Sequence, residues 1–185
     1  MSLLIVGGVI VLLGVILIVM YNGLVRARLR VDEAWAQIDV QLKRRHDLIP
    51  NLVNAVKGYM DFEESTLTQV TQARANAVAA GAQGPAEAAA AENQLTGTLR
   101  SLFAVMENYP QLRASENVSQ LQEELSTTEN QISFSRQHYN ATVLSYNTSI
   151  ATVPSSIIAG MFGFVRREFF DAGPEAQAVP EVRLR

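Results

Sequence analysis

The sequence predicts an all-α protein, in which one N-terminal transmembrane helix continues into a cytoplasmic antiparallel bundle of long helices. Two observations lead to this prediction. Residues 3–20 are all apolar or glycine, and later stretches repeat apolar residues every three or four positions, as one face of a helix does. We expect an anchor at residues 1–25, a bundle at residues 26–153, a short amphipathic helix at residues 154–172 and an extended or disordered tail at residues 173–185.

Composition excludes several classes of site. The chain has 185 residues, no cysteine and a net charge of −3. Disulfides, thiol catalysis and thiolate metal sites are therefore excluded, and packing must supply the stability. The basic residues gather near the apolar run and do not spread over the folded body, which argues against nucleic-acid binding.

The run at residues 3–20 is typical of a membrane anchor, because about 20 helical residues cross the hydrocarbon core of a bilayer. It lacks the basic start and small-residue cleavage site of a signal peptide. Because basic residues favour the cytoplasmic side, we expect the amino terminus outside and the body in the cytoplasm. The residues expected at the membrane interface are Tyr21, Arg26, Arg28 and Arg30.

The first long helix is predicted from a seam of residues that recur every three or four positions. These are Leu24, Arg28, Val31, Trp35, Ile38, Leu42, Arg45 and Ile49. Pro50 either kinks or ends this helix, and helical spacing beyond it favours a kinked continuation to about Arg74. Since Trp35 faces the predicted partner helix, we expect Trp35→Ala to cost about 3–5 kcal/mol of stability.

Two more helices and a final long one complete the predicted bundle. An alanine-rich stretch breaks at a loop near residues 80–85, and the next helix ends near Tyr109-Pro110. The last helix runs from about Ser115 to Val153, with a heptad of Val118, Leu125, Ile132, Tyr139, Tyr146 and Val153. The residues expected to form the structural core are Trp35, Ile38, Leu42, Pro50, Tyr139 and Tyr146.

The residues after Pro154 are too apolar for a solvated loop and too few to span a bilayer. Two interpretations remain open. The favoured one is a short helix that folds back over the end of the bundle. The other is an interfacial segment that lies in the lipid headgroups, with Arg166 and Arg167 on lipid phosphates.

A search for reaction chemistry finds no site. Residues three positions before His46 and His138 are Lys43 and Ser135, so the Glu-x-x-His pairs of dinuclear metal bundles are missing. The sequence has no phosphate-binding glycine loop and no nucleophile elbow. We interpret His138 as a surface residue and assign His46 to the charged cluster from Lys43 to Asp47. We predict no enzyme activity, no metal and no cofactor.

Several blocks of residues carry a resemblance to a known family. In the first half they are Tyr21-Asn22, Ala34-Trp35, Ile38 to Arg45, Asp47 to Val53 and Val56 to Tyr59. In the second half they are Leu121-Gln122, Leu125, Glu129-Asn130, Ile132, Arg136, Tyr139-Asn140, Val143, Tyr146-Asn147, Ile150, Pro154 and Phe169-Phe170. With these blocks the chain resembles the LemA family of bacterial membrane proteins over nearly its whole length, except that Val153 stands where the family often has an aromatic residue.

This resemblance implies one N-terminal membrane helix and a cytoplasmic helical bundle in the bacterial cytoplasmic (inner) membrane. It implies no assigned reaction, and a relative among magnetosome proteins favours, by analogy, work on membrane organisation. The leading hypothesis is therefore a non-enzymatic scaffold that contacts the lipid bilayer and forms a homo-oligomer.

The alternative hypothesis is a monomeric adaptor that docks a cytoplasmic protein through the basic run Lys43-Arg44-Arg45, which also fits a salt-bridged solvated face. Under the two hypotheses, the candidate contacts with a partner or with lipid are Lys43, Arg44, Arg45, Ile157, Ile158, Phe162, Phe164, Arg166 and Arg167.

Overall fold

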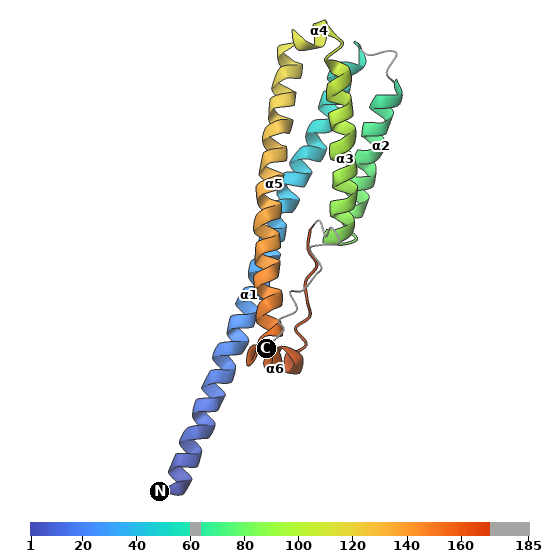
Figure 1. Cartoon of the computed structure of the whole chain (residues 1–185). Helices are drawn as coiled ribbons and strands as arrows, with labels where there is room; N and C mark the ends of the chain where they lie inside the picture. The colour runs from blue at the N-terminus through green and yellow to red at the C-terminus, as the bar shows by residue number, and fades with distance from the viewer. Residues whose placement is uncertain (60–63, 171–185) are drawn as a thin grey trace, which may run out of the picture. The chain divides into compact units, whose positions relative to one another are not determined.

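The computed structural model describes residues 1–59 and 64–170. The helices are α1 (Ser2–Lys57), α2 (Glu64–Ala80), α3 (Pro85–Met106), α4 (Pro110–Arg113), α5 (Glu116–Ala151) and α6 (Ser155–Phe162), as labelled in Figure 1. The described residues contain no strand, so the predicted all-α class is confirmed. The tail predicted at residues 173–185 lies outside the described residues.

The chain folds as two compact units. The first unit contains Met1–Ala36 and His138–Arg167, and the second contains Gln37–Gln137 together with the described residues from Glu168 onward. Helices α1 and α5 each contribute one part to both units.

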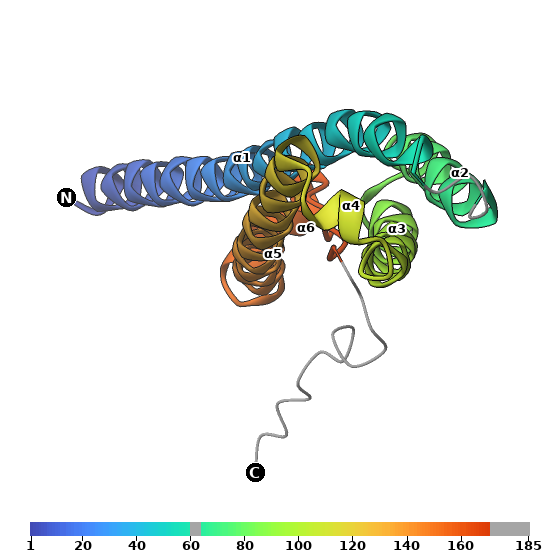
Figure 2. The ribbon, with the colours of Figure 1, turned by 90° about the horizontal axis from the view of Figure 1, so that it is seen from above.

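The second unit is built around an apolar core from five helices. Its buried members are Ile49, Leu52, Val56, Leu67, Val70, Ala73, Ala77, Leu95, Leu99, Leu102, Met106, Leu112, Val118 and Leu125. Gly84, with φ 131°, adopts a backbone conformation that favours glycine, and Pro85 follows at the first position of α3, where its missing N–H costs nothing. Figure 2 shows α4 between the ends of α3 and α5.

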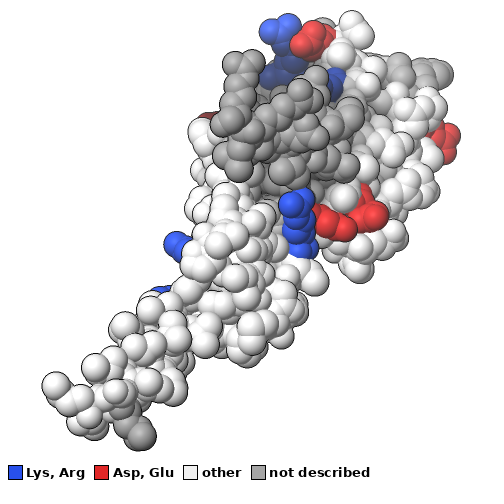
Figure 3. Space-filling model, turned by 60° about the horizontal axis from the view of Figure 1, so that its bottom comes forward, with Lys and Arg blue, Asp and Glu red and all other residues white. Residues whose placement is uncertain are grey.

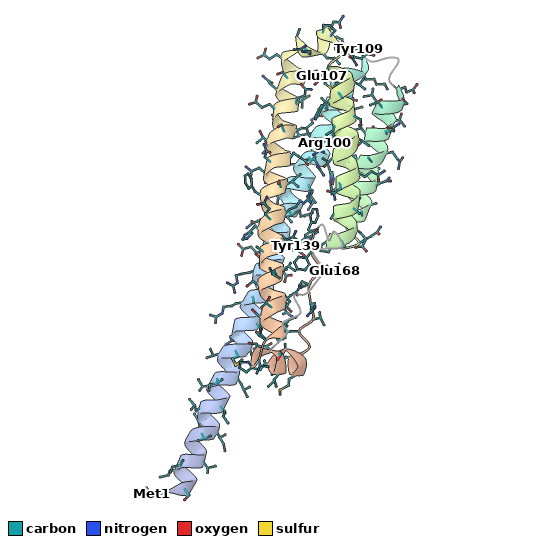
Figure 4. The ribbon with its side chains drawn as sticks, in the orientation of Figure 1. Met1, Arg100, Glu107, Tyr109, Tyr139 and Glu168 are labelled. Carbon is teal, nitrogen blue, oxygen red and sulfur yellow. The ribbon has the colours of Figure 1, made fainter. Side chains whose placement is uncertain are left out.

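In the first unit, residues 24–34 of α1 pack against the end of α5 and against α6. Its buried residues are Leu24, Ala27, Val31, Ala34, Tyr139, Val143, Tyr146, Ile150, Ile158 and Ala159. The ring of Trp35 is half-buried and lies 5.6 Å from the ring of Tyr139, which comes from α5 (Figure 4). Because part of the indole stays in water, the expected cost of Trp35→Ala moves to the lower end of its range, about 3 kcal/mol.

The prediction that the first helix continues past Pro50 is confirmed, but its expected extension to Arg74 is wrong. Pro50 lies inside α1, but α1 ends at Lys57, before Gly58, and α2 begins separately at Glu64. Glycine is the weakest helix former after proline, which accounts for the end of α1 there.

Pro50 is tolerated inside α1 because another donor replaces its missing N–H. In an unbroken helix, residue 50 would donate to the carbonyl of His46. Here the Nε–H of Arg74, on α2, donates to that carbonyl oxygen at 2.6 Å. The second helix of the unit therefore repairs the gap that proline leaves in the first.

The heptad assigned to the last helix is wrong at its final position. Val153 is 79% exposed, because α5 ends at Ala151 and the helical period no longer applies beyond it. The five earlier heptad positions, from Val118 to Tyr146, are all buried.

Candidate functional site

The basic run at residues 43–45 is engaged within its own unit. Lys43 pairs with Asp39 at 2.6 Å on the exposed side of α1, and Arg44 lies 4.0 Å from Glu124 of α5. Arg45 points the other way and is 1% exposed. These three neighbours therefore face different surroundings, as consecutive helical residues do.

Arg45 stands at the centre of a buried ionic network between α1, α3 and α5. Its guanidinium forms a short ion pair with Glu92, and its Nη1 donates to Glu129 at 2.5 Å. Nη1 also donates to the Thr96 hydroxyl at 2.9 Å. Arg45 was predicted as a contact for a partner or lipid, and this is wrong, because the side chain is buried and its charge is already balanced by two carboxylates.

His46, assigned from the sequence to the charged cluster from Lys43 to Asp47, belongs to the same buried network. It is 9% exposed, and its Nε2 lies 2.8 Å from the second carboxylate oxygen of Glu92. Burial alone would raise the pKa of Glu92, but the hydrogen bond to His46 and the charge of Arg45 outweigh it, so this pKa lies below its ordinary value of 4.5. Glu92 is thus held ionised inside the bundle.

Sequence analysis did not single out Glu92, although the sequence contains a signal for it. The buried face of α3 runs through Ala88, Glu92, Leu95, Leu99 and Leu102, at helical spacing. An acid on one apolar seam and an arginine on another indicate a buried pair, because an unpaired buried charge is too costly to persist.

An open groove of about 380 Å³ lies beside this network. Residues of α3 and α5 line it, among them Arg100, labelled in Figure 4, and Glu129. Within residues 1–59 and 64–170, no three His, Asp or Glu side chains gather as a group that could hold a metal ion. The ion pairs and hydrogen bonds of the network join α1, α3 and α5 inside the second unit.

Tyr21, predicted at the membrane interface, contacts two aromatic rings of the C-terminal segment. Its ring lies 4.8 Å from that of Phe162 and 5.8 Å from that of Phe164. The guanidinium of Arg28 lies 5.6 Å from the centre of the Phe164 ring, close enough for a cation–π contact. Arg26 and Arg30 are exposed.

Helix α6 buries one side and exposes the other. Ile158 was predicted as a partner or lipid contact, and this is wrong, because the side chain is 2% exposed and packs inside the first unit. Ile157 and Phe162 are exposed, and Phe164 is half-buried against Tyr21. Gly163, with φ 69°, ends the helix in a left-handed conformation, and the N–H of Phe164 returns to the Ala159 carbonyl at 2.9 Å.

The segment after α6 is fastened to α5 and α1. The Tyr146 hydroxyl donates to the Val165 carbonyl at 2.9 Å, and burial raises the pKa of that hydroxyl. The Asn147 side chain makes two bonds of 2.9 Å with the backbone of Arg167. The hydrogen-bond partner of the Asn147 side chain is therefore the backbone of this segment.

Arg167 is held by an acid of the first unit. Its guanidinium pairs with Asp32 of α1 at 2.8 Å, so it does not meet a lipid phosphate as an unpaired cation. Arg166, the other arginine predicted for that role, is exposed.

Comparison with known proteins identifies the family. A model of the LemA family matches residues 34–184. The chain belongs to the LemA family. The resemblance in the sequence blocks is thereby confirmed.

Relatives include two kinds of protein. Magnetosome protein MamQ of Magnetospirillum gryphiswaldense is 24% identical over 182 residues, which cover 85% of this chain and 67% of the relative. Magnetosome protein MamQ 2 of Paramagnetospirillum magneticum is 26% identical with the same coverage. Protein LemA of Metamycoplasma hominis is 28% identical over 153 residues, or 82% of this chain and 68% of the relative.

These relationships and helix α1 identify a membrane-associated protein. Among the described residues, α1 is the helix that is long and apolar enough to cross a membrane. Its most apolar stretch is not buried in the folded chain. Neither the LemA family nor these relatives are named as enzymes.

Proposed function

We propose that this LemA-family chain is a non-enzymatic, single-pass protein of the bacterial cytoplasmic membrane, whose helical body self-associates as a scaffold for the membrane or a membrane assembly. One observation carries the membrane anchoring in this proposal. The large apolar side chains of residues 4–19 are 44% to 82% exposed, and they belong to the same helix that enters both folded units. Figure 3 shows that the visible face of this stretch carries no charged side chain.

The charges next to the span support an orientation. Arg26, Arg28 and Arg30 follow the apolar stretch within three turns, and cytoplasmic flanks carry an excess of basic residues. The amino terminus then lies outside and the body lies in the cytoplasm.

Single cysteines test this orientation, because the natural chain has none. We expect Ser2→Cys to react with a membrane-impermeant maleimide on intact spheroplasts. The exposed Ser119, on α5, provides the opposite control, since Ser119→Cys should react only after permeabilisation. The reverse pattern would show that the body faces outward.

The contacts of the basic run weigh against the adaptor alternative. Arg45 is buried, and Lys43 and Arg44 lie near acids of their own unit, so the run is a poor docking patch. The relatives named magnetosome proteins favour, by analogy, a part in a larger assembly.

The mass of the protein in detergent tests the scaffold. We would measure the full chain and residues 21–185 by light scattering with detergent subtraction, keeping Tyr21 and Leu24 because both make contacts in the first unit. A defined oligomer for both proteins supports self-association of the helical body. An oligomeric full chain beside a monomeric truncated body would show that assembly depends on the span and not on the body. Monomers of both proteins would refute a self-associating scaffold.

A further inference from the structure

The exposed side of α6 is the strongest unexplained surface of the first unit. Ile157 and Met161 lie one helical turn apart and are 61% and 69% exposed, and Phe162 and Val165 beside them are 58% and 71% exposed. Helix α6 contains no charged residue. A large apolar cluster that faces solvent marks a surface that is covered in the working protein.

The contacts of Tyr21 show at which point along α1 the exposed side of α6 lies. Tyr21 follows the apolar stretch directly, and about 20 helical residues, or about 30 Å, correspond to the hydrocarbon core. A tyrosine at that point is typical of the membrane–water interface. Because Phe162 and Phe164 pack on Tyr21 at 4.8 Å and 5.8 Å, α6 is attached to α1 at the level where the span leaves the bilayer.

The attachment is built from several independent contacts and is therefore a fixed feature of the unit. Tyr146 holds the carbonyl of Val165, Asn147 holds the backbone of Arg167 through two bonds, and Arg167 pairs with Asp32. Ile158 and Ala159 anchor the inner side of α6 in the unit's core. The outer side is thereby held in one orientation.

We propose that the outer side of α6, with Ile157, Met161 and Phe162, inserts together with Val165, which follows the helix, into the headgroup and upper acyl region of the same phospholipid bilayer that α1 crosses. The occupant is lipid because the surface is apolar, uncharged and continuous with the span through Tyr21. Arg26 and Arg30 follow Tyr21 along α1 and Arg166 follows Val165, and these exposed cations suit anionic headgroups. The inference rests on the proposed membrane anchoring by α1, and it adds a second contact with the bilayer.

Fluorescence quenching in vesicles tests the inference with the full-length protein. Met161→Cys and Ile157→Cys would each carry an environment-sensitive fluorophore in vesicles of phosphatidylethanolamine and phosphatidylglycerol, with spin labels on the headgroup or at defined acyl depths. Leu13→Cys, in the span, reports whether α1 is inserted. Ala141→Cys is the control for a position in water. Ala141 lies on α5, two residues after Tyr139, whose ring contacts the ring of Trp35. Trp35 lies about 20 Å beyond Tyr21 along α1.

We expect the fluorophores at positions 157 and 161 to show blue-shifted emission relative to position 141 and to be quenched most strongly by headgroup or shallow acyl spin labels. The fluorophore at position 13 should be quenched by deep acyl labels. Emission at 157 and 161 that matches position 141, with position 13 still quenched, overturns the α6 inference and leaves the anchor intact. A blue shift without quenching by any lipid label also overturns it, because protein then covers the surface. Unquenched position 13 overturns the anchor and this inference together.

Discussion

At the scale of single residues, Arg45 is expected to matter far more for stability than the lysine two positions before it. Replacing Arg45 by Met leaves the buried carboxylate of Glu92 without its cation, and breaking a buried pair costs about 3–5 kcal/mol. Lys43→Met removes an exposed pair with Asp39 and should change the free energy of unfolding by less than about 1 kcal/mol. Urea denaturation of both variants measures the difference, and similar small losses would contradict the buried network.

Glu92 should also make stability depend on pH. Because its pKa is lower in the folded protein than its ordinary value of 4.5, its contribution is fully present above that value and is lost as pH falls through the lowered pKa. We expect Glu92→Gln to flatten the acid limb of a plot of unfolding free energy against pH.

The control for this pH dependence is Glu124→Gln. Glu124 is about half exposed and only 4.0 Å from Arg44, so its replacement should leave the acid limb nearly unchanged. An acid limb that is equally steep in Glu92→Gln and in the natural protein would show that other groups cause it.

The residue-scale features differ in how far the sequence predicts them. Ile38 and Leu42 are buried at 0% and 5% exposure, and their helical spacing is visible without a structure. The role of Arg45 is not visible from helical spacing alone, because an arginine on a seam fits both a docking patch and a buried pair. Only the three-dimensional approach of α3, which brings Glu92 to Arg45, decides between them.

At the scale of helices, the passage of α1 through Pro50 depends on Arg74 of α2. Arg74→Met removes the donor to the His46 carbonyl, and a buried acceptor left without a partner costs about 1–3 kcal/mol. In a Pro50→Ala background, residue 50 regains its N–H and can bond that carbonyl itself, so the same Arg74→Met substitution should cost less. Unfolding free energies of the four proteins measure this coupling, and equal costs in both backgrounds would show that Arg74 acts otherwise.

Helix boundaries follow the local signals of the sequence where glycine and proline act alone. The loop predicted near residues 80–85 matches the interval between α2 and α3. Helical spacing correctly favours a continuation through Pro50, but it does not reveal the contact from Arg74 that supports the proline. The end of α1 at Lys57 coincides with the local signal of Gly58. Periodicity also does not predict how the segment after α6 is attached, because Asn147 and Tyr146 bond backbone atoms about 20 residues away.

At the scale of the whole molecule, the proposed arrangement combines a span that would give stable anchoring with a second apolar surface that is too small to anchor the protein alone. We expect residues 21–185 to bind anionic vesicles weakly and reversibly, with an association constant no greater than about 10⁴ M⁻¹, the value for one acyl chain. The reason is that insertion of a few side chains, each worth up to about 1.5–3 kcal/mol, is offset in part by the loss of rotational and translational freedom. Co-sedimentation with vesicles measures this binding.

A matched pair of triple variants assigns the binding to one surface. Serine at Ile157, Met161 and Val165 should abolish vesicle binding by residues 21–185, whereas serine at Val40, Val78 and Phe134, which are 50% to 66% exposed, should leave it unchanged. Equal losses in both triple variants would indicate nonspecific hydrophobic adsorption, and no binding by the parent would mean that the span alone holds the protein.

If only the first triple variant loses binding, the chain meets the bilayer at two points. Two contacts restrict the tilt and rotation of a helical body more than a single span does. A scaffold needs that restriction, because subunits held in one orientation can present matching surfaces to each other.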